Sequence, residues 1–207
     1  MTLAMTPPLS LFLAACVLPV FFARIRAVPL WLAVQALALA WITLAQHGEL
    51  SLHSLTAAVE IVAVRGWLAP ALLWRTLAAH PLARTDLMPS NLFAWGAAVT
   101  VIILALEFGI GASVDAGALT LGAGSVSVSV ALLILATNAA APAQLLALLF
   151  MENALALFES TMPTPWPWPV HGALSAVYLL TVAVGNWLAA SDKSLGTVVA
   201  EEARDNA

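Results

Sequence analysis

The sequence predicts an all-α protein, a polytopic membrane helix bundle with about seven transmembrane helices. Of its 207 residues, 62% are hydrophobic and only 9% are charged, whereas about a quarter of a soluble domain is charged. The mean hydropathy is +0.98. The apolar runs are long and continuous, without the period of two that a membrane-spanning β-barrel requires.

Prolines, glycines and charged residues divide the chain into seven apolar stretches, each close to the ~20 residues that span a bilayer core. They are expected at residues 9–23, 28–45, 55–77, 91–110, 119–136, 143–160 and 172–188. We expect four N-terminal helices over residues 1–112 and a three-helix core over residues 113–190. Residues 191–207 are polar and acidic, which predicts a flexible cytoplasmic tail or, alternatively, a docking strap.

The flanking residues justify each stretch. Pro7 and Pro8 open the first, and two arginines close it; the second ends at the polar run QHGELSLH. The third contains Pro70, which is expected to kink it, and the fourth follows a polar linker. The fifth is rich in small residues at its start, which favours close helix packing. The sixth begins after Pro142, and the seventh follows the run PTPWPWPVH.

The positions of lysine and arginine predict the orientation, because cytoplasmic loops carry an excess of both. Every Lys or Arg outside the spans follows the first, third or seventh stretch: Arg24, Arg26, Arg75, Arg84, Lys193 and Arg204. This pattern predicts an outside N-terminus and a cytoplasmic C-terminus in a prokaryotic inner membrane. The loop with Trp166 and Trp168 then lies at the outer interface, where indole rings are favoured.

The sixth stretch carries Glu152 near its middle, with Asn153 beside it. An ionised carboxylate in hydrocarbon costs about 2.5–3.5 kcal/mol on insertion scales, so two interpretations are open. A protonated or hydrogen-bonded Glu152 ties this helix to a neighbour, or Glu152 is a proton site, since burial favours the neutral form of a carboxyl group. Arg65 is expected at a similar depth in the third stretch, where it can pair with Glu152 or with a neighbouring protein chain.

Other titratable groups are expected nearer the outer surface. Glu60 and Arg65 are five residues apart, or ~140° around an α-helix, so they are not expected to face each other. One interpretation is a polar route from mid-membrane to the outside, and the other is that side chains near helix ends extend to water. We favour the second for Glu49, Glu159 and the loop histidines, and function or contact with a neighbouring chain for Arg65, Glu152 and Glu60. The outer groups are Glu60, Glu107, Glu159, His171, His47, Glu49 and His53.

The sequence contains no motif for several common kinds of binding or catalytic site. The single cysteine, Cys16, cannot form a disulfide or a thiolate metal cage within the chain. There is no basic patch for nucleic acid, no glycine-rich phosphate loop and no helix-spaced pair of histidines for haem or metal. We therefore expect no cofactor, no metal and no active centre in this chain. Gln35 and Asn186, which lie inside spans, are interpreted as interhelical hydrogen-bonding residues.

The run LLALLFMENALALF, with its mid-membrane Glu152, resembles the helix of subunit K of respiratory complex I and of the corresponding small subunit of the multisubunit cation/proton antiporters. The Leu/Met-Glu-Asn form, the four added helices and the length near 200 residues resemble more closely component E of energy-converting membrane hydrogenases of the formate hydrogenlyase type. The segments VQALAL and VRGWLAPALL also agree with that family. The resemblance extends over most of the expected spans, and it consists of short motifs.

The resemblance implies that the last three helices correspond to the subunit K core and that Glu152 is the proton-pathway carboxylate. Two departures stand out. The family's buried base in the third helix is typically lysine, whereas this chain has Arg65. The last helix of the family carries a carboxylate, whereas here the segment PVHGALSAVYLL has none, and we counted His171 as its only titratable group.

These observations predict a non-catalytic membrane subunit of a complex I-like, ion-translocating oxidoreductase of the hydrogenase type. Its expected partners are the lipid bilayer and other membrane subunits, including an antiporter-like one, and no nucleic acid. One alternative is a structural scaffold in the same kind of assembly. Another is an antiporter subunit or a self-standing transporter, although the chain shows no inverted repeats or broken helices.

Overall fold

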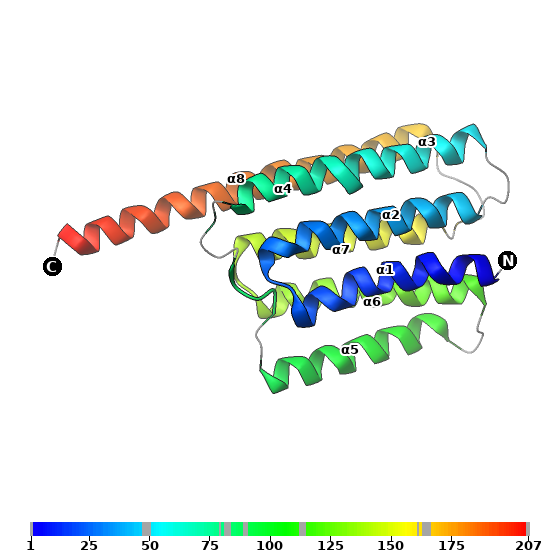
Figure 1. The fold of residues 1–207 in the computed structure, drawn as a ribbon, viewed down its shortest axis with the longest axis horizontal. Helices are drawn as coiled ribbons and strands as arrows, with labels where there is room; N and C mark the ends of the chain where they lie inside the picture. The colour runs from blue at the N-terminus through cyan, green and yellow to red at the C-terminus, as the bar shows by residue number, and fades with distance from the viewer. Residues whose placement is uncertain are drawn as a thin grey trace.

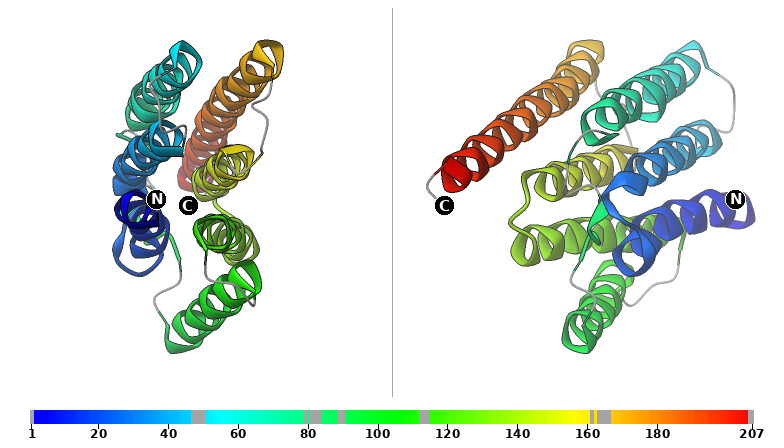
Figure 2. Two further views of the ribbon diagram at one scale, coloured as in Figure 1. Left: turned by 90° about the vertical axis from the view of Figure 1, so that its right-hand side faces the viewer. Right: turned by 60° about the vertical axis from the view of Figure 1, so that its left-hand side comes forward.

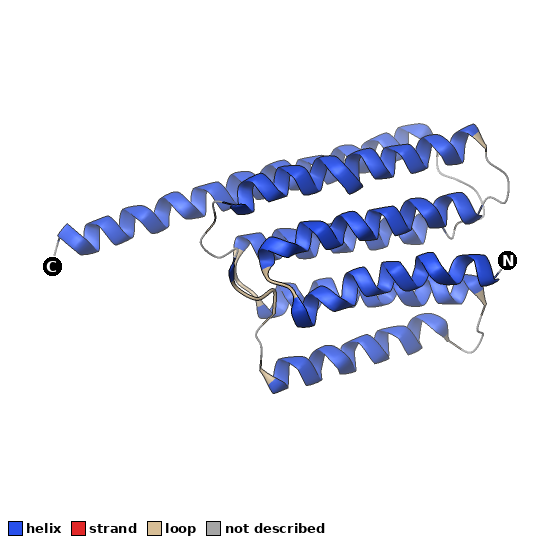
Figure 3. Ribbon diagram, in the orientation of Figure 1, coloured by secondary structure: helices blue, strands red, loops and turns tan. Residues whose placement is uncertain are grey.

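The computed structural model describes residues 2–46, 51–78, 80, 84–88, 91–111, 115–160, 162 and 167–205. Within these ranges the regular structure is helical (Figure 3), apart from an isolated β-bridge between Arg24 and Asp86. Seven helical stretches of the described chain are long and apolar enough to cross a membrane. The predicted all-α class and the number of spans are therefore confirmed.

Five of the expected spans match the observed helical stretches to within a few residues, whereas α1 begins earlier than predicted and α8 ends later. The third span is one rod built of α3, a π-helical segment η2 and α4. In chain order the elements are α1 (Thr2–Phe22), the short 3-10 helix η1 (Ile25–Ala27), α2 (Val28–Gln46), α3 (Leu52–Glu60), η2 (Ile61–Leu68), α4 (Ala69–Ala78), α5 (Leu92–Ile110), α6 (Ala116–Thr137), α7 (Ala141–Ser160) and α8 (Trp168–Asp205).

Three of the helix starts are set by side-chain caps. Ser51, Asn91 and Asp115 have extended backbone angles, and each accepts a hydrogen bond from the backbone N–H three residues later. For Asn91 and Asp115 these bonds are 2.7 Å long. Such caps satisfy N–H groups that have no partner inside the helix, which explains why α3, α5 and α6 begin at these places.

The end of the chain differs from the expected tail. The backbone of α8 is helical from Trp168 through Asp205, so the seventh span continues through Ser191 without a break. No proline interrupts this part of the sequence, and Ala, Glu and Lys, which favour helices, recur in it. Figure 1 shows this extension running past the end of the bundle.

Pro70 explains the π-helical segment that precedes it. Proline has no N–H, and its ring crowds the carbonyl group four residues earlier, which is that of Gly66. The preceding turns widen, so that the backbone N–H of Ala69 bonds to the carbonyl of Val64, five residues back. The sequence predicted a kink at Pro70. What the structure shows is a π-helical segment just before it, which contains Arg65.

The helices form two layers (Figures 1 and 2). The first layer contains α1, α2 and the α3–η2–α4 rod, and the second contains α5, α6, α7 and α8. Across the layers α1 packs on α6, α2 on α7, and α4 on α8, while α5 packs mainly on α6. Apolar side chains fill the space between the layers, with Phe12, Leu39 and Phe150 fully buried.

Exposed arginines gather at one end of the bundle. There the connection after α1 pairs with the loop after α4, because Ile25 N–H donates to Thr85 O at 3.0 Å and Leu87 N–H to Ala23 O at 3.1 Å. Asn138, after α6, donates to Leu87 O at 3.1 Å and holds the same loop. We call this the arginine end: it carries Arg24, Arg26, Arg75 and Arg84.

We predict that Gly109→Val will destabilise the α5–α6 contact. A Cβ at Gly109 would come within 2.5 Å of the Gly122 Cα atom, and overpacking of this kind costs about 1–3 kcal/mol. The control is Gly96→Val on the same helix, where a Cβ meets nothing within 4 Å. Thermal unfolding of the full chain in detergent should show a lower midpoint for Gly109→Val alone; equal midpoints would contradict the packing described here.

Candidate functional site

A line of polar side chains follows one face of α8, where α8 meets α7 and the third-span rod. His171, Ser175, Tyr178 and Thr181 are four, three and three residues apart, so they share this face. From His171 to Thr181 the line covers ~15 Å of helix. Each member faces a polar group of another helix, and we call the set the α8 polar line.

The outer part of the line lies at the end of the bundle opposite the arginine end. His171 Nε2 and Glu159 Oε1, from α8 and α7, are 3.1 Å apart, and their side chains are only 16% and 12% exposed. The rings of His171 and His53 meet edge to face, with centroids 5.6 Å apart. Glu159, which we expected to extend to water, is largely buried between α7 and α8, in contact with His171.

A cavity of about 160 Å³ adjoins these residues and reaches inward to Arg65. This volume has room for several water molecules, and its polar walls offer them partners. Next to it Ser175 donates a hydrogen bond to Glu60 Oε1, from α8 to α3. The titratable and charged groups on the cavity wall are His53, Glu60, Arg65, Glu159 and His171.

Glu60 and Arg65 both line this cavity, which the α-helical spacing did not predict. The expectation from that spacing assumed 3.6 residues per turn, whereas residues 61–68 form a π-helical segment. In such a segment hydrogen bonds join residues five apart, so positions 60 and 65 lie on the same side of the rod. Both side chains line the cavity, although no ion pair joins them among the described residues.

Arg65 is the most deeply buried charge of the described chain, with 5% exposure. Its Nη1 donates to Asn153 Oδ1 at 3.0 Å. Its guanidinium carbon lies 4.3 Å from the centre of the Tyr178 ring, which is cation–π geometry. Arg65 is thus solvated by an amide of α7 and an aromatic ring of α8, and among the described residues no ion pair joins it to Glu152.

The arginine determines the direction of a hydrogen-bond chain, because a guanidinium can only donate. Asn153 accepts from Arg65 and donates through Nδ2 to Gln35 Oε1 at 2.9 Å. Gln35 Nε2 then donates to Ser127 Oγ at 3.2 Å, and Ser127 to the carbonyl of Phe150 at 3.1 Å. The predicted interhelical role of Gln35 is confirmed, and the chain ties η2, α7, α2 and α6 together.

The side chain of Tyr178 is fully buried. It lies beside Asn153 and between the Ser175–Glu60 and Thr181–Glu152 contacts on the α8 polar line. A buried phenol usually finds a partner. A hydroxyl in this position is suited to pass a proton along the line, because it can donate one hydrogen bond while it accepts another.

Glu152 lies at the inner end of the line. Its Oε1 accepts a hydrogen bond of 2.7 Å from Thr181 Oγ1, and the residue is half-buried. Its neighbour Asn153 points the other way and is fully buried. Glu152 therefore faces the α7–α8 contact, while Asn153 faces the first layer.

The structure brings Glu60, Arg65, Glu159 and His171 to one cavity, and Glu152 lies at the other end of the α8 polar line, on the α7–α8 contact. Glu107 is part of neither, since it is exposed on α5 at the opposite edge of the bundle. His47, Glu49 and Trp166 lie outside the described residues. Asn186 Oδ1 is buried without a partner in the described chain, so its predicted hydrogen bond is not observed.

Sequence reasoning missed the hydroxyl groups of α8. It counted His171 as the only titratable group of the last span and passed over Tyr178. The spacing S-x-x-Y-x-x-T over residues 175–181 repeats every three residues, which places hydroxyls on one helical face. That spacing could have predicted a row of hydroxyl groups on one face of the last span. Their partners could not be predicted in the same way, because they belong to other helices.

The arrangement is suited to moving protons. Carboxylates and imidazoles bind and release them, and hydroxyls accept one proton while donating another. In the described part of the chain no cluster of three or more His, Cys, Asp or Glu side chains is placed to hold a metal ion. No protein family, curated protein or solved structure matches this sequence.

We predict that Asn153→Leu will destabilise the protein, because it leaves a buried guanidinium and the Gln35 carbonyl without partners. Leaving such groups unsatisfied costs about 3 kcal/mol. The double variant Arg65→Met, Asn153→Leu should regain part of this loss, since both partners are then apolar. Unfolding of the full chain in detergent measures the effect, with Gln144→Leu, an exposed amide of α7, as the control.

If Asn153→Leu unfolds at the same point as Gln144→Leu, the buried chain from Arg65 does not stabilise the fold. If the double variant is no more stable than Asn153→Leu alone, Arg65 does not depend on Asn153 for its solvation. Either result would contradict the arrangement described above.

Proposed function

We propose that this chain is a membrane subunit of a complex I-like, ion-translocating oxidoreductase of the energy-converting hydrogenase type, in which it contributes a proton path. The α8 polar line is the observation that carries the proposal. It links the cavity at Glu159 and His171 to Glu152 through side chains that can bind or relay protons. The resemblance of LLALLFMENALALF to the proton-path helices of such complexes supports the same function.

In this proposal a proton enters the cavity and is taken up by the Glu159–His171 pair or by Glu60. Ser175, hydrogen-bonded to Glu60, passes it toward Tyr178, and Thr181 connects onward to Glu152. Arg65 keeps its charge throughout, so it does not carry the proton.

The proposed orientation follows from the arginine end. Four exposed arginines lie there, and an excess of positive charge is typical of cytoplasmic loops. The N-terminus and the cavity would then face the outside of a prokaryotic inner membrane, and α8 would end in the cytoplasm. Electron transfer would take place in partner subunits, whose redox chemistry drives the movement of protons.

A second candidate is a structural scaffold of the same kind of assembly. The hydrogen-bond chain from Arg65 to Phe150 O favours it, because every member is paired and the chain joins four elements. Such a network stabilises a fixed helix arrangement without any change of protonation. The two candidates differ in what they require of Glu152 and Tyr178.

We predict that Glu152→Gln will abolish or strongly reduce proton movement without loss of assembly. Glutamine keeps the size of the side chain and can still bond to Thr181, but it cannot bind a proton reversibly at neutral pH. The complex is purified through a tag on this chain, reconstituted in liposomes, and followed with a pH-sensitive dye during turnover. Glu107→Gln, at the exposed carboxyl of α5, is the control.

A scaffold role requires a different result. There, Glu152→Gln either changes which subunits the purified complex contains or leaves both assembly and proton movement as in the unmodified complex. Subunit ratios from gels or native mass spectrometry, measured on the same preparation, separate these results from a block in transport.

We predict that Tyr178→Phe will slow proton movement at least tenfold while the complex stays assembled. The ring that contacts Arg65 is retained, and only the hydroxyl between Glu60 and Glu152 is lost. The same liposome assay measures the rate. Thr100→Ala, which removes an exposed hydroxyl bonded to its own helix, is the control; an unchanged rate in Tyr178→Phe would remove Tyr178 from the path.

A further inference from the structure

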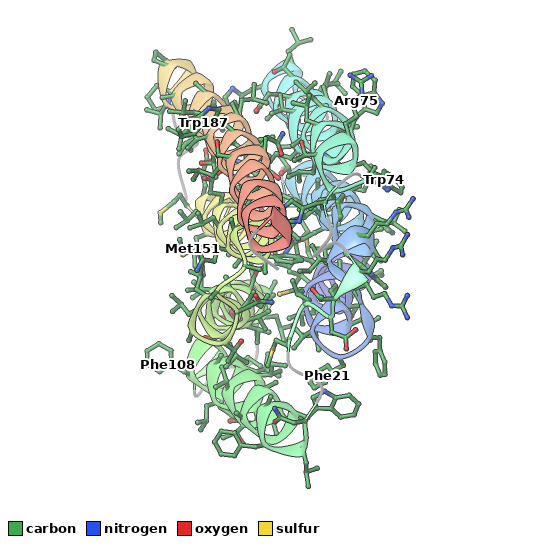
Figure 4. All side chains as sticks on the ribbon, turned by 90° about the vertical axis from the view of Figure 1, so that its left-hand side faces the viewer. Phe21, Trp74, Arg75, Phe108, Met151 and Trp187 are labelled. Carbon is green, nitrogen blue, oxygen red and sulfur yellow. The ribbon has the colours of Figure 1, made fainter. Side chains whose placement is uncertain are left out.

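A groove of about 350 Å³ follows the contact between α7 and α8 on the outer side of the second layer. Figure 4 shows Met151 of α7 and Trp187 of α8 on this side of the molecule. The walls are apolar except for Gln144 and Thr181. Leu148, Leu180 and Val184 border the groove and are 37%, 61% and 45% exposed.

The groove begins near the arginine end and runs to the middle of the membrane. Along α8 its wall extends from Leu188 to Val177, or ~16 Å of helix, which is about half the thickness of a ~30 Å hydrocarbon core. Its inner end therefore reaches the depth at which neither surface of the membrane supplies water. Thr181 lies near that inner end and donates its hydrogen bond to Glu152.

Glu152 continues the α7 wall of the groove. Gln144, Leu148 and Glu152 are four residues apart and share one helical face. The carboxyl group is half-buried, and the hydrogen bond from Thr181 reaches only one of its two oxygens. Carboxylates at this depth normally face a helix interior or a partner rather than lipid, so this face of the bundle is incomplete as it stands.

We propose that this groove is the docking surface for a transmembrane helix of a different protein of the assembly, which carries a lysine, an arginine or another hydrogen-bond donor at the depth of Glu152. The apolar walls receive the helix, and the donor completes the hydrogen bonding of the carboxyl group. The proposal concerns assembly and stands whether or not protons move along the α8 polar line.

Charge selects this occupant over two others. A second copy of the chain, docked through the same groove about a two-fold axis, would bring one Glu152 toward the other, and two carboxyl groups repel each other when ionised. A lipid acyl chain fits the apolar walls but has no donor for Glu152. A partner helix with a donor fits the apolar groove and also pairs with the carboxyl group of Glu152.

The first test fills the groove. Val184→Trp narrows it from the α8 side, and Val99→Trp, at an equally exposed valine of α5 (47% against 45%), is the matched control. After solubilisation of native membranes in mild detergent and purification through a tag on this chain, the ratios of the copurified proteins are measured. We expect Val184→Trp to lose one partner protein at least tenfold and Val99→Trp to keep all of them; equal ratios in the two variants would overturn the proposal.

The second test identifies the occupant without weakening the contact. A photoreactive phenylalanine analogue replaces Leu180 in the groove or, as a control, Leu104 on α5, and intact membranes are irradiated. We expect an adduct from position 180 only, on a transmembrane peptide of another protein with a donor residue within one turn of the linked site. Adducts to lipid alone, to a second copy, or to a peptide without such a donor overturn the proposal.

A charge exchange then tests the pairing. Replacing the partner's donor by glutamate should lower the yield of the adduct at least tenfold, and Glu152→Lys in this chain should restore it. Failure of the restoration, with both proteins present at normal levels, would show that Glu152 does not face that helix. Because the readout is a covalent adduct, a loss of proton transport in the same variants is recorded separately.

Discussion

The side chain of Arg65 cannot lose its charge, and much of the interior is arranged around that constraint. A guanidinium in an apolar core is tolerated only when other groups replace its hydration. Here an amide of α7 accepts its hydrogen bond and a ring of α8 lies against its face. Because the guanidinium only donates, it orients Asn153, Gln35 and Ser127 in turn, and this chain of bonds joins η2 and α2 of the first layer to α7 and α6 of the second.

Pro70 and Arg65 belong to the same local feature. The proline removes a backbone hydrogen bond, and the segment before it widens into a π-helix that contains the arginine. The widened segment turns Glu60 to the side of Arg65, next to the cavity. A local change in the backbone, whose cost is modest in a packed membrane helix, thus lies next to the cavity that Glu60 and Arg65 line.

The same two-layer arrangement separates the roles of adjacent residues on α7. Asn153 points toward the first layer and is fully buried, whereas Glu152 points toward α8 and the groove and is half-buried. One residue thus serves the interior network, and the next lies where a further helix can approach. Thr181 joins the two regions, since it belongs to the α8 polar line and also borders the groove.

Sequence reasoning reached the fold class, the number of spans and the buried charges, because each depends on local composition. It failed where geometry depends on a perturbed backbone or on distant partners. The α-helical spacing of Glu60 and Arg65 could not show that both line one cavity, because residues 61–68 are π-helical. Tyr178 was passed over because its position beside Arg65 joins residues more than one hundred positions apart in the chain.

By itself, therefore, the sequence determined that the chain forms helices long and apolar enough to span a membrane, and that Glu152 and Arg65 lie near the middle of two of them. Long apolar runs leave no other structure in which the backbone is fully hydrogen-bonded. Only the tertiary structure decided that Arg65 bonds to Asn153 rather than to Glu152. It also decided that hydroxyl groups of α8 bond to Glu60 and Glu152. The hydropathy profile places a residue along its own span. The partner of that residue depends on how each helix is rotated about its axis, and packing between the layers determines that rotation.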